Sequence, residues 1–250
     1  MKIANKSDVG RLRTVNEDRA IVQADVNGLT LAIVADGMGG HQAGDIASQI
    51  SIEVIQEKLQ SIHPGMSIEE FKISIKEAIY EANQKVYEAA AQNKAYMGMG
   101  TTVVVAIVSE EVIVIGHIGD SRAYKLSEDT IEQLTEDHSL VAELVKSGQI
   151  SPEEANDHPR RNVLTRALGT EQFVNVDTRH VYWKENEILL LCSDGLSSMV
   201  SREQMLEILR SDNELEWKVN RLVDCALEAG GDDNITVVLL ENVQSQTETG

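Results

Sequence analysis

Short runs of aliphatic residues recur along the chain and predict buried strands. Most of these runs are rich in Val and Ile and end at Gly, Ser or Asp, as strands of a hydrophobic core do. They cover residues 29–35, 101–108, 112–118, 123–126, 130–134, 174–182, 187–192 and 235–240. Two more short strands are expected within residues 2–28, on either side of a polar turn at 11–19. The closely spaced runs between 101 and 134 have the pattern of an antiparallel meander.

Helical periodicity occupies the segments between the strand runs. Apolar residues recur every three or four positions in 44–59, 67–93, 201–210 and 215–227, and a shorter helix is expected at 139–146. Ser67 and Glu70 form a capping box at the start of the longest helix. Residues 148–170 differ from both patterns, because they are polar and contain two prolines and a basic cluster. Such a segment predicts a flap or a small subdomain.

The order of these elements predicts an α+β fold. Strands come in runs and helices come in pairs, so two stacked, mainly antiparallel sheets (a β-sandwich) flanked by helix pairs would bury every apolar stripe, in α-β-β-α layers. The chain contains no internal repeat and no linker. We therefore expect one domain over residues 1–241, with the flap at about 148–170. The polar residues 242–250 are expected to form a disordered tail.

Composition and charge restrict the partners. The formal net charge is −19, from 41 acidic and 22 basic residues, so binding to nucleic acid or to an anionic membrane is disfavoured. The first ten residues lack the apolar stretch of a signal peptide, and no apolar run approaches the roughly 20 residues that span a bilayer. Cys192 and Cys225 lie in apolar surroundings without a CxxC motif, which is typical of thiols in a reducing compartment. We expect a monomer in the cytoplasm.

Four turns share one acidic design. Asp36, Asp120, Asp194 and Asp233 each border an aliphatic strand, and each has a glycine adjacent or one position further away. A single turn of this kind is ordinary, since its aspartate can hydrogen-bond its own backbone. Four of them in one chain predict strand ends that converge on one place.

Converging carboxylates would need cations. Their mutual repulsion would raise at least one pKa unless metal ions neutralised the cluster. The six histidines are scattered without zinc spacing, and no EF-hand loop is present, so an all-oxygen site predicts Mg²⁺ or Mn²⁺. Two such ions would activate a bridging water and neutralise an anionic substrate, for which a phosphate ester is the natural match. Arg13 is a candidate to grip the phosphate, and the alternative for it is a solvated turn arginine.

Six motifs in order carry a family resemblance. RTVNEDR, ADGMGG, GMGTT, GDSR, CSDG and GDDNIT resemble those of the metal-dependent protein phosphatases of the PPM family, in particular its short bacterial members. The match runs from about residue 2 to residue 241. The resemblance implies a β-sandwich with a dinuclear Mg²⁺ or Mn²⁺ site, serine/threonine phosphoproteins as substrates, and a Ser/Thr protein kinase as the opposing enzyme and a substrate.

The resemblance also implies roles for individual residues. Asp36 would bridge two metals, the carbonyl of Gly37 would bind the second, and Asp194 and Asp233 would complete the first. Asp120, with Asp194, would hold a weaker third ion. Other residues would act without binding metal directly. Glu17 and Asp18 would orient metal-bound waters, and Arg13 would bind phosphate. Asn234 would shape the turn, and the flap residues Arg160, Arg161 and Arg166 would contact the phosphoprotein.

The proton donor is left open by the sequence. Many eukaryotic members carry a histidine two residues after the bridging aspartate, where this chain has Met38. His41 is a candidate for that part, a role as a plain helix-entry residue is the alternative, and a metal-bound water is a third choice. Two other functions are weighed against the phosphoprotein phosphatase, namely a regulatory module without catalysis and a phosphatase of small phosphomonoesters.

Overall fold

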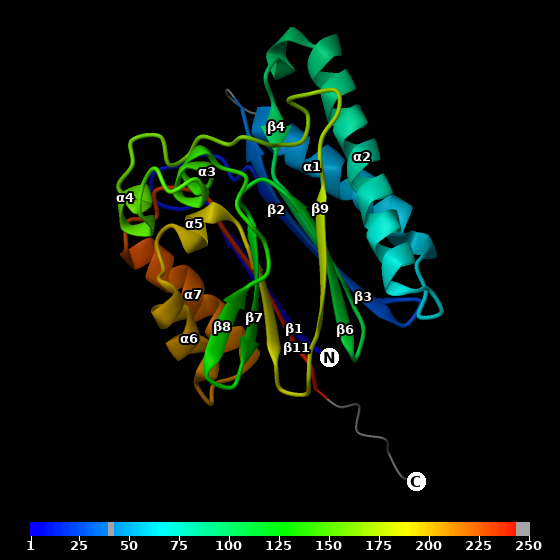
Figure 1. Ribbon diagram of the computed structural model, residues 1–250, viewed down its shortest axis with the longest axis vertical. Coiled ribbons are helices and arrows are strands. Elements are labelled where there is room, and N and C mark those ends of the chain that lie inside the picture. Colours follow the sequence, from blue (N-terminus) through cyan, green and yellow to red (C-terminus); the bar gives the residue numbers. More distant parts are fainter. Residues whose placement is uncertain (40–42, 244–250) are drawn as a thin grey trace.

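Two antiparallel sheets face each other in the computed structural model, which describes residues 1–39 and 43–243 (Figure 1). The first sheet has the order β1 (Lys2–Asp8), β11 (Ile235–Glu241), β10 (Ile188–Cys192), β7 (Arg122–Ser127), β8 (Thr130–Gln133). The second has the order β2 (Asp18–Val26), β3 (Leu29–Met38), β5 (Val103–Val108), β6 (Val112–Ile118), β9 (Asp177–Tyr182), with β4 (Gly100–Thr101) paired to the end of β3.

Helices cover the outer face of each sheet (Figure 1). The second sheet is covered by α1 (Ala43–Lys58) and α2 (Ile68–Gln92), and the first by α6 (Arg202–Arg210) and α7 (Leu215–Glu228). Three short helices, α3 (Leu140–Lys146), α4 (Pro152–Asn156) and α5 (Asp194–Ser197), and two 3₁₀ turns, Leu59–Ser61 and Lys94–Tyr96, complete the described elements. The predicted capping box of Ser67 and Glu70 starts α2. The predicted α+β sandwich is confirmed.

The apolar core lies in three layers. In β3, Leu31 and Ile33 pack toward α1 and α2, whereas Ala32 and Val34 pack between the two sheets. A third cluster joins the first sheet to α6 and α7. Because a strand in the middle of such layers is buried on both faces, its residues read as one continuous aliphatic run.

The predicted meander is wrong at its centre. Strands β5 and β6 pair in one sheet and β7 and β8 pair in the other, so the chain crosses between sheets at residues 119–121. Gly119 allows this crossing, since its φ is +101° and a Cβ there would lie 2.6 Å from the Cβ of Thr102. Aliphatic runs do not show which sheet a strand joins, which is why the sequence pattern missed the crossing.

Smaller differences concern element ends and the flap. Strand β9 begins at Asp177, three residues later than predicted, and helices α4 and α5 were not predicted. Helix α4 starts from a capping box of Ser151 and Glu154. Asn242, predicted to begin the disordered tail, is buried and donates to the carbonyl of Glu110 at 2.9 Å; residues 244–250 lie outside the described residues. Within the described chain, none of the helices has the length and apolarity needed to cross a bilayer.

Candidate metal centre

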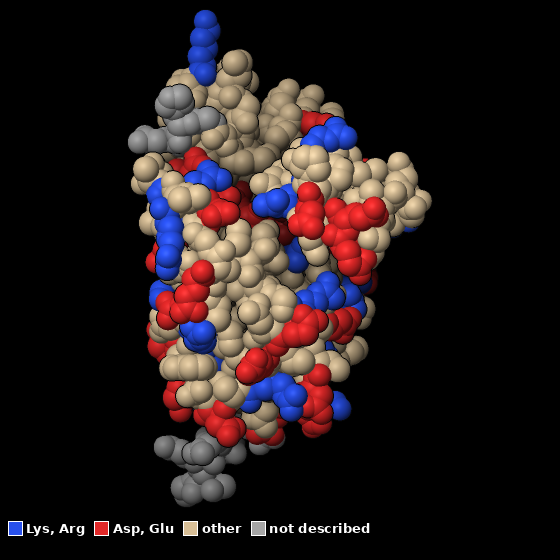
Figure 2. Space-filling view, turned by 90° about the vertical axis from the view of Figure 1, so that its left-hand side faces the viewer, with Lys and Arg blue, Asp and Glu red and all other residues tan. Residues whose placement is uncertain are grey.

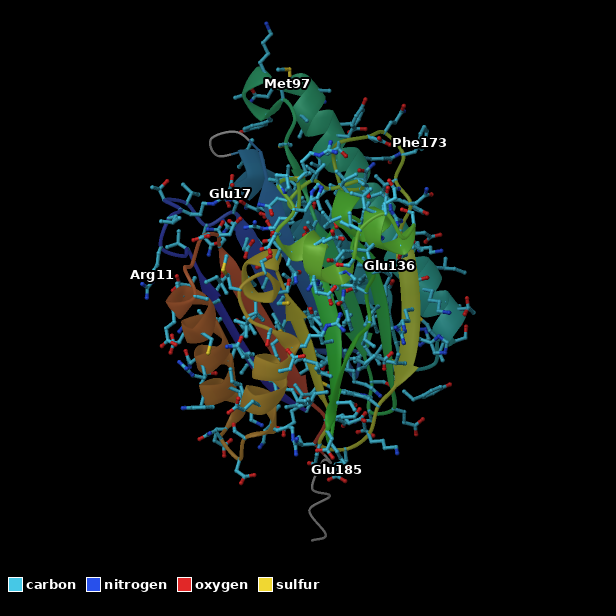
Figure 3. All side chains as sticks on the ribbon, turned by 60° about the vertical axis from the view of Figure 1, so that its left-hand side comes forward. Arg11, Glu17, Met97, Glu136, Phe173 and Glu185 are labelled. Carbon is cyan, nitrogen blue, oxygen red and sulfur yellow. The ribbon has the colours of Figure 1, made fainter. Side chains whose placement is uncertain are left out.

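The four acidic turns meet at one end of the sandwich. Asp36 follows the aliphatic run of β3, two residues before the strand ends at Met38. Asp18 at the start of β2 is its direct partner in the antiparallel register, so the two side chains lie on the same face. Asp194 starts α5 just after β10, and Asp233 lies two residues before β11. Glu17, beside Asp18, lies at the end of the sheets opposite Glu185 (Figure 3).

Burial and the charges of their neighbours raise the pKa values of the carboxylates. Burial, and then the charges of Asp18, Asp194 and Asp120 in that order, raises the pKa of Asp36 well above its usual value. Burial is also the main cause that raises the pKa of Asp18 and of Asp120 to about 7, with Asp194 contributing in both cases. Asp194 itself has a raised pKa because of burial and of Asp233. Asp120, Asp194 and Asp233 all act on the pKa of Asp36, so these four carboxylates are near neighbours in the folded chain.

The site has buried oxygen atoms without a partner. Among the described residues, Glu17 Oε1 and Asp18 Oδ1 are buried and receive no hydrogen bond. A buried carboxylate oxygen in this state is costly unless a cation or a proton meets it. An all-oxygen donor set suits Mg²⁺ or Mn²⁺, so the residues present fit divalent metal ions. No three acidic side chains of the described residues bring ligand atoms within 4.8 Å of one another.

Ser193 and Asn234 fix the acidic side chains to each other. Ser193 Oγ donates to Asp18 Oδ2 at 2.7 Å and accepts the Thr236 N–H at 3.0 Å, which joins β10, β11 and β2. Asn234 is buried; its Oδ1 accepts the Glu17 N–H at 2.8 Å, and its Nδ2 donates to the carbonyls of residues 9 and 15 at 2.9 and 3.0 Å. Asn234 thus ties the turn at residues 9–17 to the start of β11. The role of Ser193 was missed, although CSDG contains it.

The GMGTT and GDSR motifs hold the main chain of Asp36. Its carbonyl accepts the Thr102 N–H at 2.9 Å and the Thr101 hydroxyl at 2.8 Å. Its N–H donates to Thr102 Oγ1 at 3.1 Å, and that oxygen shares a hydrogen bond of 2.7 Å with Ser121 Oγ. Both motifs carry the family resemblance, but no role for their hydroxyl groups was predicted. They set the position of Asp36 rather than contribute ligands.

Two glycines bring β3 against the first turn of α1. A Cβ on Gly37 would lie 2.1 Å from the carbonyl oxygen of Gly44 and 2.7 Å from that of Glu17. A Cβ on Gly44 would lie 2.7 Å from Glu17 Oε1. Only glycine permits this approach of main chain to main chain, which leaves Glu17 between the strand end and the helix start.

Arg13 lies at the edge of the acidic cluster. Its Nη2 pairs with Asp233 Oδ2 at 2.8 Å, and its side chain is 47% exposed. Figure 2 shows a recess in the upper half of one face, with acidic side chains inside it and basic side chains on both sides. A guanidinium that is half in solvent and half on a carboxylate can turn toward an anion that enters.

The flap arginines are not gathered at the acidic cluster. Arg166 pairs with Asp177 at 3.2 Å, and its side chain is 35% exposed. Arg160 and Arg161 are exposed and form no salt bridge within the described part of the chain. His41, the candidate proton donor, lies outside the described residues.

Comparison with known proteins agrees with this geometry. The family model described as "Protein phosphatase 2C" matches residues 11–228. The chain belongs to the protein phosphatase 2C family. As an enzyme of that family, this chain is a metal-dependent protein phosphatase. It is 44% identical to the serine/threonine phosphatase stp of Listeria innocua over 94% of both chains, and 38% identical to the protein phosphatase PhpP of Streptococcus pneumoniae over 99% of this chain and 100% of that one.

Solved structures resemble this phosphatase over nearly its whole length. The serine/threonine phosphatase Stp1 from Staphylococcus aureus superimposes with a TM-score of 0.91 at 34% identity, over 98% of this chain and 95% of that one. The catalytic domain of the serine/threonine protein phosphatase PstP, in complex with two manganese ions, has a TM-score of 0.84 at 33% identity, over 97% and 98% of the two chains. The fold and the family predicted from the motifs are thus confirmed.

Proposed function

We propose that this phosphatase hydrolyses phosphoserine and phosphothreonine in proteins at a dinuclear Mg²⁺ or Mn²⁺ site, and that it opposes a Ser/Thr protein kinase. The observation that carries the proposal is the cluster of buried Asp18 with the partly buried Asp36, Asp120 and Asp194, whose pKa values are all raised. Relatives at about 40% identity are named serine/threonine phosphatases, and one structural neighbour holds two manganese ions.

Asp36, Asp194, Asp233 and the Gly37 carbonyl would hold the two ions, and Asp120 with Asp194 a weaker third. When bound, such ions neutralise the carboxylates and the phosphate and lower the pKa of water. The protein contributes rigidity: Thr102 fixes the main chain of Asp36, and Ser193 fixes Asp18. Rigid ligands lower the cost of binding, because little has to be ordered when the ions arrive.

Arg13 would bind the phosphate. It pairs with Asp233 at 2.8 Å, and a cation that takes this carboxylate would release the guanidinium. Two N–H groups of one guanidinium can then hold two phosphate oxygens. Glu17 and Asp18 present buried oxygens that accept protons from water, since both have raised pKa values caused first by burial. His41 remains a proposal for the proton donor.

The wider setting follows from the same reasoning. We propose one catalytic domain over residues 1–241 with the flap at 148–170, acting as a monomer on phosphoproteins that include a cognate kinase. A cytoplasmic location is supported by the two cysteines, which are both unpaired. Arg160 and Arg161, which are exposed, and Arg166, which is partly exposed, are proposed contacts for the phosphoprotein in the flap.

The test is metal-dependent turnover. With Mn²⁺ we expect hydrolysis of phosphothreonine peptides, loss of activity with EDTA, and a fall of at least about a hundredfold in kcat/KM for Asp36→Asn or Asp194→Asn, because each removes a ligand charge. Asp129→Asn is the control, since Asp129 is exposed and pairs only with Arg210 in the described residues. Activity that survives EDTA would refute the mechanism. A preference for sugar phosphates would favour the small-substrate enzyme, and a folded protein with no Mn²⁺ binding by calorimetry would favour the regulatory module.

A further inference from the structure

His138 holds the residue that precedes Asp120. The backbone N–H of His138 donates to the carbonyl of Gly119 at 3.0 Å. Its ring atom Nδ1 accepts the N–H of Gly119 at 3.1 Å. Both main-chain groups of Gly119 are therefore bound to one residue. Since Gly119 is also the crossing point between the sheets, these two bonds set the direction in which Asp120 leaves the turn.

The second ring nitrogen of His138 reaches away from the site. Because Nδ1 is an acceptor, the ring proton lies on Nε2, which donates to Asp177 Oδ2 at 3.0 Å. Only the neutral ring in this tautomer can make both bonds. Burial, followed by the charge of His117, lowers the pKa of His138 to about 4, which keeps the ring neutral at physiological pH.

Asp177 and the main chain of 138–140 connect this ring to the end of the flap. Asp177 pairs with Arg166 through two contacts of 3.2 and 3.4 Å. The N–H of Thr165 donates to the carbonyl of His138 at 2.9 Å, and the N–H of residue 140 donates to the carbonyl of residue 163 at 2.8 Å. Both side-chain and main-chain bonds therefore connect residues 163–166 to the segment around His138. In Figure 3, Glu136 marks the loop from which His138 comes.

The same side chains do not make a convincing metal site. His117, His138 and Asp177 offer ligand atoms within 4.8 Å of one another. However, both nitrogens of His138 are engaged, and His117 Nε2 bonds the carbonyl of Glu136 at 2.9 Å. The guanidinium of Arg166 already neutralises Asp177. The two rings lie nearly parallel, with centroids 4.7 Å apart, as packed neighbours do. A cation here would have to break bonds that are already made.

We propose that His138 is a positioning residue that ties the Asp120 turn to residues 163–166 of the flap through Gly119 and Asp177. The consequence for binding rests on the proposed function, in which Asp120 helps to hold the weakest metal ion. A flap held in this place would strengthen the binding of that ion. The bound ion would in turn stabilise the ordered flap, because coupling between two sites is reciprocal.

Two variants separate the two ends of the ring. His138→Gln can still reach Asp177 but has no acceptor at the Nδ1 position, whereas His138→Asn keeps an acceptor near Gly119 and cannot reach Asp177. For His138→Gln without metal we expect exchange of the Gly119 amide, followed by NMR, to speed up roughly tenfold. Calorimetry should show Mn²⁺ binding at the weakest site reduced roughly tenfold, as for partners of metal ligands elsewhere. His138→Asn should change Gly119 exchange less than threefold and instead speed exchange in 163–166.

His117→Gln is the control, because a glutamine can still donate to the Glu136 carbonyl and does not touch Gly119. If both His138 variants, or neither, accelerate Gly119 exchange, the proposal is overturned. Should they fail to fold, Asp177→Ala at a side chain 47% exposed serves instead, and it should speed exchange in 163–166 at least threefold; unchanged exchange there overturns the proposal. Amide exchange needs neither metal nor turnover, so a failure of the proposed function would be seen separately in the wild-type assay.

Discussion

Single side chains hold the centre together without being ligands. Asn234 is the most connected of them, because its amide bonds the main chain at residues 9, 15 and 17 and so places both Arg13 and Glu17. Ser193 plays the same part for Asp18. At the scale of the residue, the site depends on a few buried polar groups whose hydrogen bonds are all made inside the protein.

Replacing Asn234 with alanine should damage both stability and metal binding. The change leaves two carbonyls and one N–H without their partner, which we expect to cost about 3 kcal/mol in urea denaturation. Mn²⁺ affinity should fall roughly tenfold, as it does when a partner of the ligands is lost. Asn242→Ala is the matched control at the other end of β11, because it removes one buried bond to Glu110. It should lower stability and leave Mn²⁺ affinity unchanged; equal losses of affinity in both variants would contradict this role.

The elements bring their ends together by close main-chain contacts. Strand β3 meets the first turn of α1 at Gly37 and Gly44, and β6 crosses to β7 at Gly119. Each glycine lies where a side chain would push one element away from another. Glycine positions in the sequence thus indicated turns correctly. They did not show which main-chain segment each glycine approaches, because that depends on the fold.

Gly44→Ala sets two effects against each other. Alanine is the better helix former by about 1 kcal/mol, which alone would stabilise α1. The added Cβ would lie 2.7 Å from the carbonyl carbon of Gly37 and from Glu17 Oε1. Because the main chain cannot move aside, we expect a net loss of about 1–3 kcal/mol in chemical denaturation, with weaker Mn²⁺ binding. Gly65→Ala is the control and should be nearly neutral, because its Cβ would contact only the ring of exposed His63. A Gly44→Ala protein that is more stable than the wild type would contradict the expected clash.

In the whole molecule, the folded sandwich holds several carboxylates close together although they repel one another. The chain carries a net charge of −19, and part of that charge is buried at one end of the sheets. The apolar layers on both sides of the sheets hold the strand ends in place whatever their charge. Cations therefore bind a site that the fold has already assembled, and their binding relieves the repulsion.

The metal-free phosphatase should lose stability as the pH rises. Asp18 and Asp120 have pKa values raised from 3.8 to about 7 in the folded state. The folded protein therefore binds more protons than the unfolded chain between about pH 4 and 7, so its stability falls across that window. Mn²⁺ replaces those protons, and the gain in Tm on adding Mn²⁺ should be larger at pH 8.5 than at pH 6.5.

Differential scanning fluorimetry at the two pH values tests this. His138, with a pKa lowered to about 4, acts in the opposite direction, but only below the pKa of about 6.5 that it has when unfolded, so it does not interfere. Asp232→Asn removes one unit of charge next to Asp233, at a residue the described site does not use, and should leave the trend intact. A Mn²⁺ effect independent of pH would mean that the carboxylates are already ionised without metal.

Much of this protein could be predicted from local patterns. A strand that is buried on both faces has a continuous aliphatic sequence, and a helix often begins with a recognisable capping residue. The α+β sandwich, the capping box at Ser67 and the acidic turns at Asp36, Asp120, Asp194 and Asp233 were all visible in that way. The local patterns did not predict which groups come into contact in the fold. These are the crossing between sheets at Gly119, the contact of Ser193 with Asp18, that of Asn234 with Glu17, and that of His138 with both Gly119 and Asp177. Those contacts join residues from 19 to 217 positions apart, and no local pattern encodes them, since each depends on how whole sheets stack.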